Sequence, residues 1–340
     1  MEKVAIMKEL CVIEGDGISH EVIPSAVRVL QTLLPDLVIH NLVAGWDYFN
    51  KTGRSIDPST VELARFCGAV LAGAANSPSY PVEGYHSPIV RLRRELGTHA
   101  NIRPTSYLPV PTARIGIDLL VVRENTEDVY GSPEEQIEGG ATVSKRITTV
   151  ASERIAHTAY MLALQSNRKR VTIIHKANVL PQTDGLFRRV ALEVGQQYGG
   201  LEIDDLLVDT AAYWMVKDPT RFDVILTLNQ YGDILSDMAA AWGGGLGFAP
   251  ALNLGEGVAL AEPVHGTAPD IAGKGIANPT AAILSVAMLL RYHWQMPELA
   301  DRIENAVTTT LEAKLFTADL VGIRSALTTV AYTDEIIKRL

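Results

Sequence analysis

The fold is decided first by residues 10–34, which read LCVIEGDGISHEVIPSAVRVLQTLL. The apolar run at 10–13 predicts a short buried strand, and the apolar spacing across 23–34 predicts a helix. The loop between them, residues 14–17, carries two glycines. A strand that passes into a helix across a short loop of this kind is typical of an α/β protein.

The glycines of this loop do not form a dinucleotide-binding fingerprint. That fingerprint requires G-x-G-x-x-G between the strand and the helix, and His20 stands where the third glycine belongs. No acidic residue ends a clean second strand, and the sequence contains no P-loop pattern. We therefore expect an α/β fold that differs from the Rossmann fold.

The alternation of strands and helices continues along the 340 residues, a length that suits two domains. Further strands are expected at 38–43, 69–72, 119–122, 171–174, 203–208 and 224–228. Further helices are expected at 59–66, 89–96, 152–164, 184–196, 233–241, 280–292, 298–311 and 334–340. The polar, glycine-containing segment 131–149 breaks this rhythm and predicts a protruding arm. The proline-rich stretch 104–111 predicts a crossover between the domains.

Composition narrows the class of protein. A net charge of −9 argues against nucleic acid or an anionic membrane as the main partner. Cys11 and Cys67 lie in apolar stretches, which predicts small buried side chains in a reducing compartment, and two cysteines alone cannot form a zinc site. No apolar run approaches the ~20 residues of a membrane span. The charged N-terminal residues are unlike a signal peptide, so we expect a cytoplasmic protein that starts at Met1 or Met7.

Three aspartates could bind a divalent metal ion. Asp233 and Asp237 are four residues apart, so on a helix both carboxylates share one face. Asp209 follows the apolar run 206–208 at the end of an expected strand. Carboxylates with open coordination positions suit Mg²⁺ or Mn²⁺. The alternative is a solvated pair that complements the dipole at the start of a helix.

Arginines supply the positive charge that an anionic substrate requires. Arg93, Arg103 and Arg123 are candidates, and Arg123 directly follows the apolar run 119–122. A guanidinium binds carboxylates with two parallel hydrogen bonds and stays charged when it is desolvated. The alternative role for these arginines is in salt bridges on the surface. That role suits Arg91 better than Arg123, which follows an apolar run.

Two residues could move protons. Lys176 follows the apolar strand 171–174 by two positions, at the strand edge where α/β proteins build their sites, and is a candidate base. Its alternative is a structural ion pair. Tyr130 is a candidate proton donor, although a lone tyrosine is more often a packed aromatic. The long loop 262–279 is rich in small residues, which let the backbone approach a ligand closely. Asp270 in this loop could bind a ribose diol and would repel a 2′-phosphate.

Taken together, these motifs resemble the β-decarboxylating dehydrogenases, a family of isocitrate, 3-isopropylmalate, homoisocitrate and tartrate dehydrogenases. The resemblance runs from about Leu10 to the C-terminus and is carried by residues 14–17, 123–127, 175–178, 232–237, 262–279 and the three arginines. It implies a two-domain α/β fold of the isocitrate/isopropylmalate dehydrogenase type with a clasp arm. The first domain, 1–103 plus 250–340, would bind NAD. The second, 104–249, would carry dimerisation, the metal and catalytic residues and the clasp at about 131–150.

The resemblance also implies roles for individual residues. Tyr130 would be the acid and Lys176 the base, and Asp209, Asp233 and Asp237 would bind Mg²⁺ or Mn²⁺. The substrate would contact Arg93, Arg103, Arg123, Asn178, Ser87 and Val90. NAD would contact Glu262, His265, Gly266, Thr267, Ala268, Asp270, Ile271 and Asn278. The active sites would be shared in a homodimer, or in a tetramer of such dimers, with Lys176 and Asp209 supplied by the neighbouring subunit.

Within this family, residues 86–93 (HSPIVRLR) resemble homoisocitrate dehydrogenases. The expected reaction is NAD- and Mg²⁺-dependent oxidative decarboxylation of homoisocitrate to 2-oxoadipate, in lysine biosynthesis through aminoadipate. Isocitrate and 3-isopropylmalate are the alternative substrates. The apolar pair Ile89 and Val90 is compatible with 3-isopropylmalate, whose dehydrogenases have apolar residues at these positions. A non-catalytic regulatory paralogue is a remote alternative, because such a chain should have lost a catalytic or metal-binding residue, and all five are present.

Overall fold

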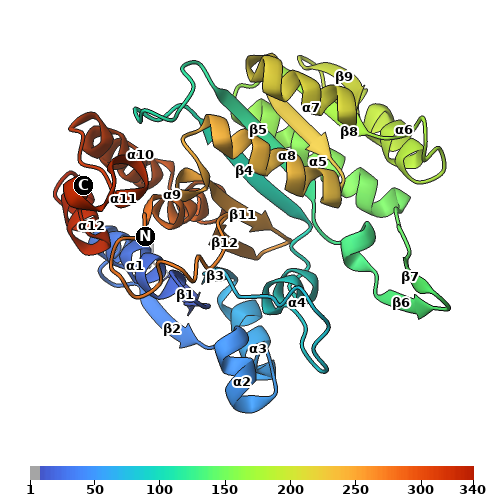
Figure 1. Ribbon diagram of the computed structural model, residues 1–340. Helices are drawn as coiled ribbons and strands as arrows, with labels where there is room; N and C mark the ends of the chain where they lie inside the picture. The colour runs from blue at the N-terminus through green and yellow to red at the C-terminus, as the bar shows by residue number, and fades with distance from the viewer. Residues whose placement is uncertain (1–7) are drawn as a thin grey trace, which may run out of the picture. The chain divides into compact units, whose positions relative to one another are not determined.

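The computed structural model describes residues 8–340 and divides the chain into two compact units (Figure 1). Unit 1 contains the chain up to Leu96, Leu108–Ala113 and Gly244–Leu340, and unit 2 contains Gly97–Tyr107 and Arg114–Gly243. The expected domain boundary after residue 103 falls inside a strand of unit 2. Met7, the alternative start, lies outside the described residues.

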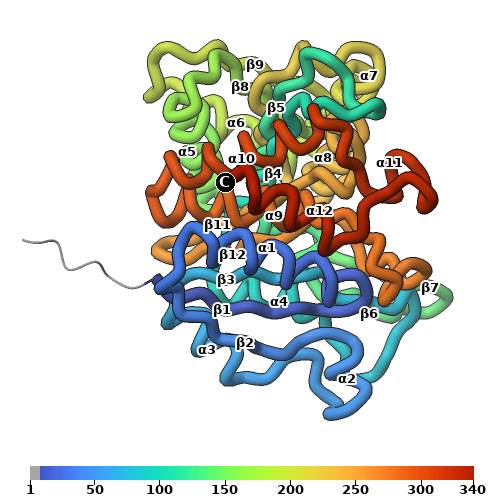
Figure 2. Tube along the Cα trace, turned by 90° about the vertical axis from the view of Figure 1, so that its left-hand side faces the viewer, coloured from blue at the N-terminus to red at the C-terminus, as the bar shows by residue number. Residues whose placement is uncertain are grey.

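Five strands of unit 1 lie side by side in the order β2, β1, β3, β12, β11 (Figure 2). They are β1 (Glu9–Ile13), β2 (Val38–Leu42), β3 (Ala69–Ala72), β11 (Pro250–Leu254) and β12 (Ala259–Pro263). All neighbours are parallel except β11 and β12, which are antiparallel. The alternation of strands and helices confirms the predicted α/β class.

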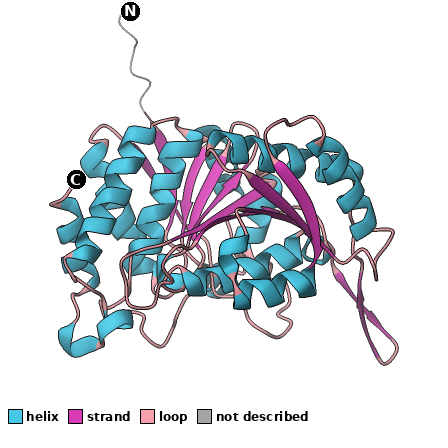
Figure 3. Cartoon of the chain, turned by 90° about the horizontal axis from the view of Figure 1, so that it is seen from above, coloured by secondary structure: helices cyan, strands magenta, loops and turns pink. Residues whose placement is uncertain are grey.

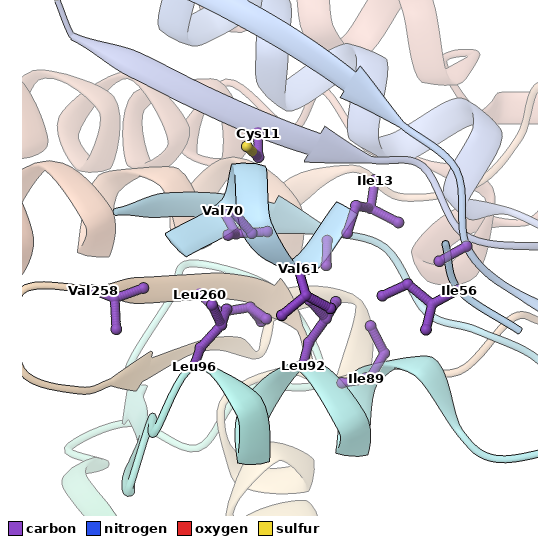
Figure 4. Close-up of a cluster of buried hydrophobic side chains, with 13 residues drawn as sticks. Cys11, Ile13, Ile56, Val61, Val70, Ile89, Leu92, Leu96, Val258 and Leu260 are labelled. Carbon is purple, nitrogen blue, oxygen red and sulfur yellow. The ribbon is translucent and has the colours of Figure 1, made fainter. Parts of the chain in front are cut away.

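The helices of unit 1 are α1 (Ser19–Leu33), α2 (Trp46–Thr52), α3 (Pro58–Cys67), α4 (Pro88–Glu95), α9 (Thr280–Met288), α10 (Pro297–Glu312), α11 (Ala318–Val321) and α12 (Thr329–Ile337), with short turns η3 (Leu246–Phe248), η4 (Leu289–His293) and η5 (Ile323–Ser325). The helices bury apolar side chains, except α2 and α11, which contain no buried residue. Side chains alternate along β1, so Cys11 and Ile13 point into the cluster beneath α3 and α4 (Figure 4). Among residues 8–340, no helix combines the length and the apolar character needed to cross a bilayer.

The glycines of the first loop serve close backbone packing. Gly17 has a φ of 62°, and a Cβ at this position would lie 2.1 Å from the carbonyl oxygen of Thr267. The next residue, Ile18, donates its N–H to the same oxygen at 2.9 Å. The carboxylate of Asp16 accepts the N–H groups of Trp46, at 2.8 Å, and two other residues. This loop therefore fixes the backbone at Thr267, in the segment expected to bind NAD.

Unit 2 has its own five strands in the order β4, β5, β10, β8, β9. They are β4 (Ala100–Ser106), β5 (Asp118–Glu124), β8 (Arg170–His175), β9 (Glu202–Leu207) and β10 (Val224–Thr227). β4 runs antiparallel to β5, and the other neighbours are parallel. The carboxyl ends of β5, β10, β8 and β9 therefore meet at one edge, where polar residues can gather.

Helices cover both faces of this sheet. α5 (Thr149–Gln165) and α6 (Asp184–Gly195) pack together, while α7 (Val208–Lys217) and α8 (Asn229–Trp242) share a core with Val121, Ile174 and Ile225 (Figure 1). Two short turns, η1 (Val129–Gly131) and η2 (Pro219–Arg221), complete the unit. Helix α8 begins at Asn229, one turn before the predicted start at residue 233, because its first residues are polar and add nothing to the apolar period.

A two-stranded hairpin extends from unit 2 (Figure 3). It pairs β6 (Glu134–Ile137) with β7 (Gly140–Val143), and every residue in both strands is exposed. The hairpin occupies the segment expected to form an arm, and α5 already begins at Thr149, inside the expected range. That two subunits exchange these strands remains a prediction.

Candidate active site

Two buried arginines of unit 2 lie on the same face of β4 and β5. In the antiparallel register Asn101 is opposite Arg123 and Arg103 is opposite Val121. Because side chains alternate along a strand, all four point to the face covered by α8. Arg103 is 7% exposed and Arg123 is 2% exposed. Both guanidinium groups are thus held in the interior, where they need anionic partners.

Helix α8 provides those partners. Arg103 Nη1 lies 3.2 Å from Asp237 Oδ1 and 3.4 Å from Asp233 Oδ1, and Arg123 Nη1 donates to Asp233. The predicted pair of carboxylates on one helix face is therefore present. The alternative, a pair at the start of a helix, does not describe it, since α8 starts a turn earlier and the two arginines supply the positive charge. Burial raises the pKa of Asp237, Arg103 opposes this shift, and the charge of Asp233 adds to it.

Two residues fix the position of Arg123: Asn229, which the sequence did not indicate, and Gly232, which it indicated only as part of the motif 232–237. Asn229 Oδ1 accepts hydrogen bonds from Arg123 Nε at 2.9 Å and from Nη2 at 2.7 Å. Gly232 faces the aliphatic part of the arginine, where a Cβ would lie 2.6 Å from its Cγ. The position of Asn229, directly after the buried run 224–228, is the signal that could have identified it.

Tyr130 lies beside this cluster, in η1. Its ring centre is 5.8 Å from the Arg123 guanidinium carbon. Burial raises the pKa of Tyr130, and the negative charge of Asp233, to which its hydroxyl also hydrogen-bonds, raises it further. The phenol therefore keeps its proton at neutral pH. The turn that carries it is held by Asp128, whose buried carboxylate accepts the N–H groups of Val129 at 2.8 Å and Gln230 at 3.0 Å.

Lys176 and Asp209 form a separate ion pair in unit 2. The parallel register of β8 and β9 ends with His175 opposite Leu207. Lys176 and Asp209 therefore follow the ends of two neighbouring strands. The hydrogen bond from Lys176 lowers the pKa of Asp209. Asp209 lies in the first turn of α7 rather than at the end of a strand. Asn178 is exposed in the turn that follows Lys176.

A buried network that the sequence reasoning also missed supports the Lys176 loop. The N–H of Lys176 donates to Asp184 Oδ2 at 2.7 Å, and Asp184 is fully buried at the start of α6. Lys145, just beyond β7, places Nζ 2.7 Å from Asp184 Oδ1 and 3.6 Å from Asp128 Oδ1. One lysine at the base of the hairpin thus links the turns that carry Lys176 and Tyr130.

The three candidate metal ligands do not converge within one chain. Among residues 8–340, the oxygens of Asp209, Asp233 and Asp237 do not all lie within 4.8 Å of one another. Asp233 and Asp237 lie with Arg103, whereas Asp209 is paired with Lys176. An all-carboxylate set fits Mg²⁺ or Mn²⁺ chemically, and one chain brings two of its three members together.

The candidate substrate residues of unit 1 lie on α4. Arg93 Nη2 is 2.5 Å from Glu262 Oε1, whose second contact is Asn253 Nδ2 at 2.6 Å. Ser87 caps the helix by accepting the N–H of Val90, which is 47% exposed. Ile89 instead packs into the core beside Leu92 (Figure 4). Of the two apolar residues expected to face the substrate, only Val90 is exposed.

Apart from Glu262, which lies within β12, the candidate NAD-binding residues of unit 1 follow that strand. His265 is 9% exposed, its Nδ1 lies 2.9 Å from the carbonyl oxygen of Gly266, and its Nε2 has no hydrogen-bond partner among residues 8–340. Burial lowers the pKa of His265, so the ring is neutral and Nε2 can accept a hydrogen bond. A Cβ added at Gly266 would meet no heavy atom within 4 Å among the described residues. An unpartnered buried nitrogen beside an open backbone fits a bound ligand.

The remaining residues of this loop differ in exposure. Ala268 has a φ of 37°, an unusual backbone conformation for a residue with a Cβ, and Thr267 before it packs on Gly17. Asp270 is exposed and Ile271 is half-buried. Asn278 is buried and donates to Asp319 at 2.9 Å. Glu262, expected to contact NAD, is held in the interior by Arg93 and Asn253.

Known proteins resemble this chain over nearly its whole length. The family described as isocitrate/isopropylmalate dehydrogenase matches residues 9–336. An isocitrate/homoisocitrate dehydrogenase of Thermus thermophilus is 48% identical over 97% of this chain and 98% of its own. A 3-isopropylmalate dehydrogenase of Archaeoglobus fulgidus is 45% identical over 97% of this chain and 98% of its own.

A solved structure gives the same result for the fold. The isocitrate dehydrogenase of Methylococcus capsulatus superimposes with a TM-score of 0.93 at 37% identity, covering 98% of this chain and 99% of that one. The family consists of oxidative decarboxylases that use NAD(P) and a divalent metal ion. The resemblance inferred from the motifs is confirmed: the chain belongs to the isocitrate/isopropylmalate dehydrogenase family.

Proposed function

We propose that this enzyme converts homoisocitrate and NAD⁺ into 2-oxoadipate, CO₂ and NADH with the help of Mg²⁺ or Mn²⁺. The observation that carries the proposal is the cluster of Arg103, Arg123, Tyr130, Asp233 and Asp237. It combines two fixed cationic groups, two carboxylates and a protonated phenol in one unit. The product would enter lysine biosynthesis through aminoadipate.

Each part of the cluster has a chemical role in this reaction. Arg103 and Arg123, together with Arg93 from α4, bind the carboxylates of the substrate, for which the planar guanidinium is suited. When bound, NAD⁺ accepts the hydride from C2, and a divalent ion polarises the C2 oxygen. Lys176 removes the proton of the C2 hydroxyl. Tyr130 then gives its proton to C3 after CO₂ has left.

The proposal requires two subunits for each active site. Within one chain Lys176 and Asp209 pair with each other, apart from the cluster around Asp233 and Asp237. A homodimer, or a tetramer of such dimers, would let the neighbouring subunit supply the base and the third carboxylate. Asn178 follows Lys176 in the same exposed turn and would reach the substrate from that neighbour.

For the coenzyme we propose NAD rather than NADP. Asp270 is exposed in the loop that follows β12, and the apolar Ile271 comes next. A carboxylate accepts hydrogen bonds from both hydroxyls of a ribose and repels a 2′-phosphate. We expect a Michaelis constant for NAD well below that for NADP in steady-state assays, and the reverse order would contradict this assignment.

The choice among substrates rests on the first turn of α4. A tricarboxylate needs a polar partner for its distal carboxylate, and Ser87 has an O–H group that can donate while its oxygen caps the helix. The exposed Val90 favours the isopropyl group of 3-isopropylmalate instead. Because Ile89 is buried in the core, the apolar surface available to that group is small. The names of the relatives include all three substrates, and the Thermus protein is named for two of them.

Steady-state kinetics with the three acids, NAD and Mg²⁺ test this choice. We expect kcat/KM for homoisocitrate to exceed that for the other two acids by about tenfold or more. An equally large preference for 3-isopropylmalate or isocitrate would contradict the proposed substrate, but not the membership of the family. The variant Val90→Arg sharpens the test, because a guanidinium at this position should raise kcat/KM for the two tricarboxylates and lower it for 3-isopropylmalate.

A further inference from the structure

We propose that Glu9, Cys11, His40 and Cys67 of unit 1 form a zinc site. None of these residues belongs to the cluster of aspartates, arginines and Tyr130 in unit 2. The four side chains come from β1, β2 and α3, so a bound ion would join three elements of the unit.

The strand register brings the donors together. In the parallel pair of β1 and β2, Cys11 is opposite His40. Glu9 is two residues before Cys11, so the three side chains share one face of the sheet. Cys67 is the last residue of α3, the helix that packs on this face, and Gly68 ends the helix there with a φ of 68°.

The distances are close to those of a coordination sphere. His40 Nε2 lies 2.9 Å from Glu9 Oε2, and Cys67 Sγ lies 3.7 Å from the same oxygen. The donor atoms of Glu9, His40 and Cys67 all lie within 4.8 Å of one another, and no other such group occurs among residues 8–340. Around tetrahedral zinc, donors are roughly 3.3–3.8 Å apart, because the bonds are about 2.0–2.3 Å long. Small shifts of the side chains, with His40 Nε2 and Glu9 Oε2 moving slightly apart, would therefore allow tetrahedral coordination.

Cys11 would provide the fourth donor, although its thiol lies outside the group of donors within 4.8 Å of one another and would have to move toward the ion. Its thiol hydrogen-bonds to the thiol of Cys67, and its side chain is fully buried in the cluster beneath α3 (Figure 4). Glu9, His40 and Cys67 are half-buried, which leaves a route for an ion from solvent. The two cysteines alone could not form a zinc site, but His40 and Glu9 complete the set.

The type of donor selects the metal. Two sulfurs, one imidazole nitrogen and one carboxylate oxygen suit zinc, whereas the aspartates of unit 2 offer oxygen alone and suit Mg²⁺ or Mn²⁺. The two sites should therefore take different ions from a mixture. Because ion binding ties β1, β2 and α3 together, zinc should also raise the melting temperature of the protein.

The experiment uses the full chain, reduced with a phosphine and supplied with excess Mg²⁺. Co²⁺ is added as a spectroscopic substitute for zinc. We expect a sulfur-to-cobalt charge-transfer band that saturates at one equivalent per chain and disappears when Zn²⁺ is added. Zn²⁺ should raise the melting temperature, and a chelator should reverse the rise. An ion bound to the aspartates would give no such band.

Variants assign the band to its ligands. Cys67→Ser should abolish the charge-transfer band. His40→Gln should weaken the binding of Zn²⁺ by at least about tenfold, because replacing residues that only support a metal ligand already costs that much affinity. His20→Gln is the matched control, since His20 pairs with Glu14 at 3.0 Å and neither residue belongs to a group of three possible ligands among residues 8–340. The proposal is wrong if the unmodified chain shows no band, a measurement that needs no variant. Equal zinc binding by Cys67→Ser and the unmodified chain would also overturn it.

Discussion

The phenol of Tyr130 shows how single residues set the chemistry of the site. Its ring faces Arg123, its hydroxyl bonds to Asp233, and burial together with that carboxylate raises its pKa. A group with a raised pKa stays protonated while the substrate is bound, as a proton donor must. Sequence alone suggested this role weakly, because nothing in the residues around Tyr130 distinguishes an acid from a packed aromatic.

The variant Tyr130→Phe should lower kcat on the order of 10²–10⁴-fold, since it removes the donor and little else. Steady-state kinetics with homoisocitrate and NAD measure the loss, with NAD binding as a check that the fold is intact. Tyr107→Phe is the control, because Tyr107 is a comparably exposed tyrosine outside the cluster. Equal kcat values for Tyr130→Phe and the unmodified enzyme would show that the proton comes from elsewhere.

His99 ties the stability of unit 2 to pH. Burial lowers the pKa of His99 to about 4 from its usual 6.5, and the charge of Arg154 acts in the same direction. The unfolded chain therefore takes up a proton that the folded chain refuses between these values. The free energy of unfolding should fall as the pH drops from about 6.5 towards about 4.

His99 Nε2 lies 3.1 Å from Thr158 Oγ1. We expect His99→Gln to remove the pH sensitivity, because a neutral amide can still form this hydrogen bond. Between about pH 7 and about pH 5, the unmodified chain should lose about 1 kcal/mol more of its unfolding free energy than the variant, a figure reduced for the partial exposure of the ring. Urea denaturation at both pH values measures the difference. An identical loss in both proteins would show that His99 titrates normally in the folded state.

At the scale of elements, the contact between β5 and α8 builds the cationic pocket. Gly232 allows α8 to lie against the side chain of Arg123, where any Cβ would meet the aliphatic carbons of the arginine rather than its flexible end. Glycine costs about 1 kcal/mol relative to alanine inside a helix, so its presence here needs this packing reason.

Gly232→Ala should therefore displace Arg123 and raise KM for the substrate by about tenfold or more, a loss that corresponds to a weakened charge-assisted hydrogen bond. The matched control is Gly185→Ala in α6, where an added Cβ meets nothing closer than 4.0 Å. The control should keep its KM and gain helix stability. If both variants behave alike in steady-state kinetics, the packing of Gly232 on Arg123 has no role in substrate binding.

Elements with a clear apolar pattern could be predicted from the sequence, and those shaped by their neighbours could not. The runs at 10–13, 69–72 and 224–228 form strands as expected. Strand β4 escaped prediction because polar residues and Pro104 interrupt it, although its pairing with β5 is continuous. Strands β11 (PALNL) and β12 (ALAEP) each contain a proline and a polar residue, which weakens the apolar signal, and their pairing with each other gives them their conformation.

At the scale of the whole molecule, the division of the site follows from topology. Local spacing in the sequence placed Asp233 and Asp237 on one helix face, but their contacts with Arg103 and Arg123 join distant parts of the chain and come from the fold. The sequence could not place Asp209, whose partner within the chain is Lys176. Local spacing carries no information about a second chain, so the sharing of active sites rests on the family resemblance and on the separation of the two clusters.

Subunit complementation tests this sharing most directly. The variants Lys176→Ala and Tyr130→Phe should each be nearly inactive alone. If the neighbour supplies Lys176, a mixed dimer contains one intact site, and a statistical mixture of co-refolded chains should recover about a quarter of the normal activity. If each chain builds its own complete site, every site in the mixture keeps one defect. Activity that stays at the level of the separate variants, despite mixed dimers shown by mass spectrometry, would contradict the account.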